Sequence, residues 1–238
     1  MLHVTSPIKT LVLSRMKDNA AKPYPFEIED WGHTDYDTAL EKQKGYVRER
    51  IDGTRPDTLV FTEHLPVYTM GVRKGAKNHL IWDEETLSEK GIALHKTNRG
   101  GDITYHGPGQ LTAYPIISLE KLRDLHAYLR LMEDVLIDLV GRFDLKAHRR
   151  DGLTGIWIEK RKIAAIGVAV KSWVSYHGFA LNVNNDLSPF TGIVPCGIVD
   201  GTVTSLKQEL GHEVDMSNLQ SVVSQSFESV FRSYFVGI

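Results

Sequence analysis

Cysteine is nearly absent from this sequence, which has only Cys196 among its 238 residues. A single thiol cannot form an intramolecular disulfide, so nothing indicates an oxidising compartment. The net charge is only −2, whereas domains that bind nucleic acid are generally strongly basic. The sequence also lacks an apolar stretch long enough to cross a bilayer and the long apolar core of a signal peptide. We therefore expect a cytoplasmic protein with no nucleic-acid and no membrane partner.

Repeats, low-complexity segments and linkers are absent too, which favours a single domain over residues 1–238. A chain of this length with 42% hydrophobic residues can bury a substantial core. Residues 1–30 form an N-terminal extension whose role the sequence does not indicate. Within this extension, Ile8–Leu13 is predicted to be a strand, although the acid-free stretch Met1–Lys17 also resembles a transit peptide. Asp18–Asp30 contains proline and is predicted to be irregular.

Apolar periodicity predicts most of the regular elements. Leucines and a methionine three and four residues apart along Leu122–Val140 form one apolar stripe, which is typical of a helix packed on a core. Other helices are predicted from Thr34 or Asp35 to about Arg50, over Asp83–Lys90 and over Leu219–Tyr234. The predicted strands include Thr58–Thr62, Ser175–Val183, and a hairpin of Gly155–Glu159 with Lys162–Lys171. This order predicts an α+β fold with a mixed, mainly antiparallel sheet flanked by helices.

A glycine-rich stretch, Arg99–Gln110, stands at the centre of the chain. Its four glycines and one proline exclude a helix. Apolar runs lie on both sides, Ile92–His95 before it and Leu111–Ile117 after it, so we expect two strands joined by a tight glycine-lined connection. The polar residues 104–106 within it could belong to a binding site. The alternative is a hairpin without chemistry.

The lone cysteine is a candidate nucleophile. It lies between Pro195 and Gly197, a loop setting that favours an exposed thiol, although a lone intracellular cysteine is often a small buried apolar residue. A thiol attacks as thiolate and therefore needs a base or a cation nearby. The candidates for that partner are His64, His106, His177 and Lys162. Three histidines and a cysteine could also bind a metal, but their spacing matches no zinc pattern, so we expect none.

Lys162 opens the apolar run Ile163–Gly167. A lysine at the mouth of an apolar strand can be partly desolvated, which lowers its pKa and allows it to serve as a base. The alternative is an ordinary surface lysine at the end of a strand.

Several motifs together resemble the lipoyl(octanoyl) transferase family of lipoate biosynthesis. The main ones are Arg99–Gln110, Lys162–Gly167, His177–Val183, Asp186–Phe190 and Pro195–Gly197, and weaker ones are Glu63–Thr69 and Val203–Leu206. They occur in the family's order and cover roughly residues 36–211. The long N-terminal extension is the main departure from the family.

The resemblance implies an acyltransferase with the α/β fold of biotin and lipoate protein ligases and no cofactor. Octanoyl acyl carrier protein would be the donor, and lipoyl domains of 2-oxoacid dehydrogenase and glycine cleavage proteins the acceptors. Cys196 would carry the acyl group as a thioester, Lys162 would be its acid/base partner, and His64 and His177 would support the site. The substrate-binding residues would be Arg99, Gly100, Gly101, Asp102, Ile103, Thr104, Tyr105, His106, Ala165, Ile166, Gly167, Gly178, Phe179 and Ala180.

Other functions are compatible with the same residues. A lipoate or biotin ligase would activate its acid with ATP, a binding module would only hold an acylated carrier, and a thioesterase would pass the acyl group to water. The basic pairs Arg149–Arg150 and Lys160–Arg161 also suggest a docking surface for an acidic carrier protein.

Overall fold

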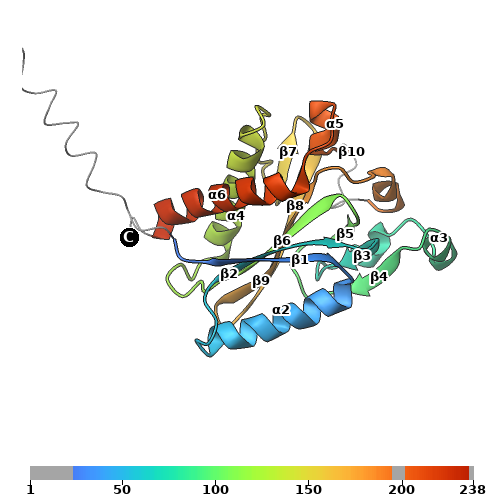
Figure 1. Ribbon diagram of the computed structural model, residues 1–238. Coiled ribbons are helices and arrows are strands. Elements are labelled where there is room, and N and C mark those ends of the chain that lie inside the picture. The colour runs from blue at the N-terminus through green and yellow to red at the C-terminus, as the bar shows by residue number, and fades with distance from the viewer. Residues whose placement is uncertain (1–23, 195–201, 236–238) are drawn as a thin grey trace, which may run out of the picture.

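The computed structural model describes residues 24–194 and 202–235 (Figure 1). The predicted strand Ile8–Leu13 and the candidate nucleophile Cys196 lie outside these residues. The described elements, in chain order, are β1 (Glu27–Thr34), α2 (Tyr36–Ile51), β2 (Thr58–His64), β3 (Val67–Met70), η1 (Ala76–His79), α3 (Glu84–Glu89), β4 (Ala93–Lys96), β5 (Ile103–His106), β6 (Gln110–Ile116), α4 (Leu125–Gly141), β7 (Ile156–Ile158), β8 (Arg161–Lys171), β9 (Val174–Asn182), η2 (Ser188–Gly192), β10 (Thr202–Val203), α5 (Leu206–Leu210) and α6 (Met216–Phe235). Among the described helices, none is long and apolar enough to span a membrane.

A large sheet runs through the molecule in the order β1-β2-β6-β9-β8-β10, with β7 also paired to β8. The β1–β2 and β8–β10 pairs are parallel and the other pairs are antiparallel. The predicted mixed, mainly antiparallel sheet is therefore confirmed. A smaller sheet, in the order β4-β3-β5, lies beside it.

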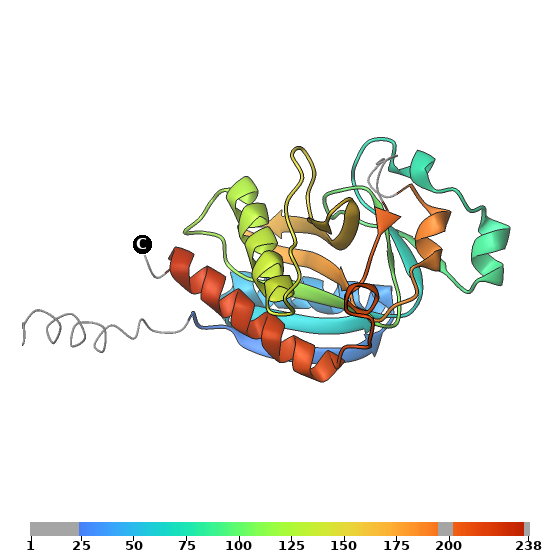
Figure 2. The same cartoon turned by 90° about the horizontal axis from the view of Figure 1, so that it is seen from above.

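Helices cover both faces of the large sheet. Successive residues of a strand point to opposite faces, so Phe61 packs in the core under α4 and α6 while Val60 packs on the α2 side. Figure 1 shows α2 on one face, and Figure 2 shows α4 and α6 side by side on the other. A ring contact between Tyr128 of α4 and Phe231 of α6 joins these two helices. The apolar stripes predicted from the sequence are the faces that pack on this sheet.

Side-chain caps define where two of the helices begin. The Asp35 carboxylate accepts a hydrogen bond from Thr38 N (2.9 Å), which starts α2 at the predicted position. In α4 the cap is Asp124, so the helix begins three residues later than the apolar stripe predicts. The physical reason is Arg123, whose φ of 41° places it outside helical geometry.

The prediction of irregular chain up to Asp30 is wrong for its last four residues, which belong to β1. This strand pairs with β2 at the edge of the sheet and leaves even Ile28 half exposed. Backbone hydrogen bonds to β2 hold the strand without a buried apolar run. The sequence therefore has no alternation of apolar and polar residues that would predict this strand.

The glycine-rich stretch does not form the predicted tight connection between two paired strands. Its middle forms β5, which pairs with β3, and the flanking strands β4 and β6 belong to different sheets. The Gly100 N–H donates to the Val168 carbonyl of β8 (2.8 Å), so the stretch crosses from the small sheet onto the large one. A Cβ at Gly167 would lie 2.8 Å from Gly100 O, which explains why only glycine permits this close crossing.

Candidate active site

A cavity of about 180 Å³ lies where the glycine-rich stretch crosses the large sheet. It is larger than the roughly 150 Å³ apolar cavity that can admit benzene. The predicted site residues that the structure describes line this cavity, with three exceptions: Gly100, Tyr105 and His64. Gly100 makes the crossing contact with β8, and Tyr105 packs between the rings of Tyr68 and Phe190.

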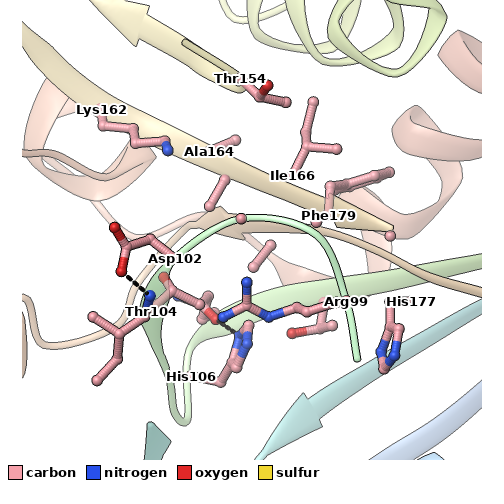
Figure 3. Close-up of a pocket in the computed structure, with 18 of the residues that line it drawn as sticks. Arg99, Asp102, Thr104, His106, Thr154, Lys162, Ala164, Ile166, His177 and Phe179 are labelled. Carbon is pink, nitrogen blue, oxygen red and sulfur yellow. Dashed lines mark hydrogen bonds between the residues drawn. The ribbon is translucent and has the colours of Figure 1, made fainter. Parts of the chain in front are cut away.

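The cavity has two chemically different sides (Figure 3). Lys162, Ala164, Ile166 and Phe179, from strands β8 and β9, lie on one side together with Thr154, and this side is mostly apolar. Arg99, Asp102, Thr104, His106 and His177 lie on the other side, which is polar. A hydrocarbon chain therefore has an apolar wall to lie on, and a polar acyl or amine group has hydrogen-bonding partners opposite.

The guanidinium of Arg99 is held by backbone and hydroxyl oxygens of Thr69 in β3 and of the adjacent Gly100. Its Nη2 donates to Thr69 O (2.5 Å), Nη1 donates to Gly100 O (3.0 Å), and Nε donates to Thr69 Oγ1 (3.2 Å). The residue is only 8% exposed, so this is a fixed positive charge on the polar side of the cavity. Its burial could not be predicted from the charged side chain itself.

The three predicted histidines are buried and neutral. His106 donates from Nδ1 to Gln110 Oε1 (2.8 Å), and burial lowers its pKa well below the usual value. His177 donates from Nε2 to Asn98 Oδ1 (3.0 Å), and its pKa falls to about 3 through burial and then the nearby positive charges of Arg99 and Lys44. These side chains therefore act as fixed hydrogen-bonding groups at neutral pH.

His64 lies behind the cavity wall. Its Nδ1 donates to Thr34 O (2.8 Å) and its Nε2 accepts from the Tyr114 hydroxyl (2.5 Å). Burial lowers the pKa of His64 to about 4. Tyr114 lines the cavity, so His64 contacts the cavity wall through this tyrosine. Tyr114 is fifty residues away in sequence, and no pattern identified it.

Lys162 is buried, with 7% of its surface exposed. The interpretation as a surface lysine is therefore wrong. Its ammonium lies 5.1 Å from the centre of the Trp157 ring. The side chain also lies against Gly155, where an added Cβ would be 2.8 Å from Lys162 Cε. Lys162 is therefore packed into the cavity wall.

In the basic pairs Arg149–Arg150 and Lys160–Arg161, one arginine of each pair forms ion pairs within the chain. Arg149 pairs with the carboxylates of Glu133 (2.8 Å) and Asp134 (2.5 Å). Arg161 likewise pairs with Glu159 (3.2 Å) and Glu209 (2.9 Å). Two of the four charges are therefore neutralised within the chain.

The described residues that flank residues 195–201 lie at or near this cavity. On one side, the Val194 N–H donates to His79 O (2.8 Å), and His79 Nδ1 lies 2.7 Å from a carboxylate oxygen of the cavity residue Asp102. On the other side, Val203 lines the cavity and pairs in register with Lys162. Within the described residues, no three His, Cys, Asp or Glu side chains are grouped as metal ligands would be.

The sequence matches the lipoyl protein ligase A/B catalytic domain over residues 35–228. The chain belongs to this family. It is 44% identical over 201 residues to a curated octanoyltransferase of Geobacter metallireducens, covering 84% of the chain and 91% of that protein. The fold is similar to that of a lipoate-protein ligase A bound with ATP, with a TM-score of 0.72 and 17% identity over 88% of this chain and 86% of that one.

A biotin protein ligase from Aquifex aeolicus is a more distant structural neighbour of this ligase-family chain. Its TM-score is 0.52 at 9% identity, covering 90% of this chain and 71% of that one. Together with the ligase A structure, it confirms the predicted biotin and lipoate protein ligase-like fold.

The buried histidines predict that the protein loses stability in mild acid. The folded-state pKa values of His64 and His177 lie below the value of about 6.5 expected after unfolding, so the unfolded chain binds more protons as the pH falls. Stability present above about pH 6.5 should therefore fall by about 1.4 kcal/mol per pH unit for each histidine. Urea unfolding at pH 7.5 and 5.5 measures this difference.

Two variants separate the buried histidines from other titrating groups. His64→Gln should reduce the dependence of unfolding free energy on pH, while His212→Gln, at an exposed position, should leave it unchanged. Equal unfolding free energies at the two pH values would show that these histidines are not held neutral.

Proposed function

We propose that this protein carries an octanoyl group from acyl carrier protein to a lysine of lipoyl domains through a thioester on Cys196. Octanoyl transfer in lipoate biosynthesis, predicted from the motifs, is confirmed by the curated octanoyltransferases to which the chain is similar. The thioester on Cys196, the carrier-protein donor and the lipoyl-domain acceptors of 2-oxoacid dehydrogenase and glycine cleavage proteins are our proposal. A cytoplasmic location is also part of our proposal.

One observation carries the proposal: of the described residues that flank the segment with Cys196, Val203 pairs in register with Lys162, and Val194 bonds to His79, which contacts the cavity residue Asp102. We infer from these flanking residues that Cys196 lies within reach of Lys162. The apolar wall of the same cavity, formed by residues such as Ile166 and Phe179, suits a saturated acyl chain.

The reaction then proceeds in two balanced steps. Lys162 takes the proton of the Cys196 thiol, and the thiolate attacks the carbonyl carbon of the octanoyl thioester on the carrier. The carbon–sulfur bond to the carrier breaks, and the departing thiolate takes the proton from Lys162. In the second step the acceptor lysine attacks the Cys196 thioester. It loses a proton to Lys162, and the Cys196 thiolate leaves and takes that proton from Lys162.

The exchange of one thioester for another is nearly balanced in free energy, so the site mainly has to activate the thiol and position the two reactants. A cavity whose polar side chains are held in place by backbone and amide oxygens can provide this positioning. The fixed positive charge of Arg99 lies on the side of the cavity opposite the apolar wall, where it favours partial negative charge on an acyl oxygen.

The experiment that tests the proposal is octanoyl transfer without nucleotide. Purified protein mixed with octanoyl acyl carrier protein and a lipoyl domain, with no ATP, should octanoylate one lysine of the lipoyl domain, as measured by its intact mass. A strict requirement for ATP with free octanoate would instead identify a ligase. Release of octanoate without any modified lipoyl domain would identify a thioesterase.

A further inference from the structure

A carboxylate is buried within the apolar stripe of α4. Glu133 is 0% exposed and lies between the core residues Met132 and Val135. Its Oε2 accepts from Arg130 Nη1 (2.5 Å) and from Arg149 Nε (2.8 Å). A buried ion pair is often no more stabilising than apolar side chains of the same volume, so stability alone does not account for a carboxylate here.

The second oxygen of the same carboxylate has a directional partner. Glu133 Oε1 accepts from the backbone N–H of Gly155 (3.1 Å). Arg149 and Gly155 are near the two ends of one loop, which is closed at its base by reciprocal backbone hydrogen bonds between His148 and Trp157 (2.8 and 2.9 Å). Glu133 therefore fixes both arms of this loop to α4. The loop also contributes residues 152–154 to the cavity wall.

Gly155 connects this fixed loop to Lys162, because the lysine side chain packs against its backbone. A Cβ added at Gly155 would lie 2.8 Å from Lys162 Cε, 3.3 Å from its Nζ and 2.6 Å from Ala164 O. Gly155 also has a φ of +127°, which side-chain-bearing residues rarely adopt. The lysine stem thus lies on the bare backbone at Gly155, and the Trp157 ring is 5.1 Å from its ammonium.

We propose that Glu133 and Gly155 are positioning residues that hold the Lys162 amine where it meets the reacting thiol. The carboxylate fixes the position of the loop relative to α4. The missing side chain at Gly155 leaves the space that the lysine stem fills. The inference rests on the proposed function, because it assumes that Lys162 exchanges protons with Cys196. Neither positioning residue lines the cavity, so they act through the lysine.

Two variants change this support in different ways. Gly155→Ala should push the lysine stem away, and Glu133→Gln should loosen the loop while keeping its side-chain volume. For each variant we expect kcat for octanoyl transfer to fall by about 10- to 100-fold, since displacement of a catalytic group by 1 Å can cost that much. KM for the carrier substrate should stay unchanged, because the cavity rim is intact.

Matched controls distinguish positioning from general destabilisation. Gly53→Ala places a side chain at another positive φ, +74°, with no atom within 4 Å of its Cβ. Asp134→Asn removes the exposed partner of the same Arg149. Both should lower the melting temperature at most and leave kcat unchanged. If Gly155→Ala does not fold, the Glu133→Gln variant carries the test by itself.

The decisive comparison combines each variant with Lys162→Ala. The measured quantity is the rate at which iodoacetamide alkylates the single cysteine at pH 7. If Glu133 and Gly155 act only through Lys162, their substitution should slow alkylation in the native background. The same substitutions should have no further effect once Lys162 is alanine. An undiminished effect in the Lys162→Ala background, or none in the native background, would overturn the positioning role. Equal rates for the native protein and Lys162→Ala would instead overturn the proposed function.

Discussion

Replacement of Cys196 by serine is expected to lower octanoyl transfer by about 10⁴-fold or more, the scale on which loss of a catalytic nucleophile is felt in other enzymes. A serine hydroxyl is far less acidic than a thiol, so the site's base cannot generate enough of the attacking anion. The chain has no other cysteine to take over the role. The measurement is the initial rate at which the lipoyl-domain lysine gains octanoyl.

The serine variant also shows whether the loss is chemical. Its circular dichroism spectrum and melting temperature should match those of the native protein, because one atom has changed. Transfer at more than a tenth of the native rate by this variant would mean that the thiol does not carry the acyl group.

Replacement of Lys162 by alanine is expected to slow both half-reactions by about 10²- to 10⁴-fold, the usual contribution of a general acid–base group. The amine is then no longer present to take the thiol proton in the first step or the proton of the incoming amine in the second. Single-turnover measurements of loading from the carrier, and of discharge to the lipoyl domain, separate the two steps.

A neighbouring lysine provides the control for this prediction. Lys160 is exposed at the turn between β7 and β8, two residues from Lys162. Lys160→Ala should load and discharge at the native rate. Native rates for Lys162→Ala would exclude it as the base, and small amines added to that variant should partly restore loading if it is the base.

Much of the fold could be predicted because its elements carry local signals. The Asp35 cap and the apolar stripe of α4 are visible in the sequence, and the hairpin of β7 and β8 is marked by the Lys160–Arg161 turn. The edge strand β1 and the short strand β5 carry no such signal. Pairing with distant strands decides both of them, and that information is not local.

The candidate site, like the fold, could be predicted from the sequence only in part. Motif residues from the four elements β8, β9, η2 and β10, together with the glycine-rich stretch, line one cavity. The sequence did not reveal the groups that orient them. His64 contacts Tyr114 on the neighbouring strand, fifty residues away in sequence. Glu133 lies on a stripe of core residues, and one of its partners, Arg149, is sixteen positions away.

Intact-mass analysis of the protein mixed with octanoyl acyl carrier protein tests the central claim most directly. We predict that the chain gains the mass of one octanoyl group and that peptide mapping places it on Cys196. The adduct should be released by hydroxylamine and should disappear when a lipoyl domain is added, as the lysine of that domain becomes octanoylated. Octanoylation of the lipoyl domain with no adduct on the protein at any time, or with the adduct on another residue, would contradict the account.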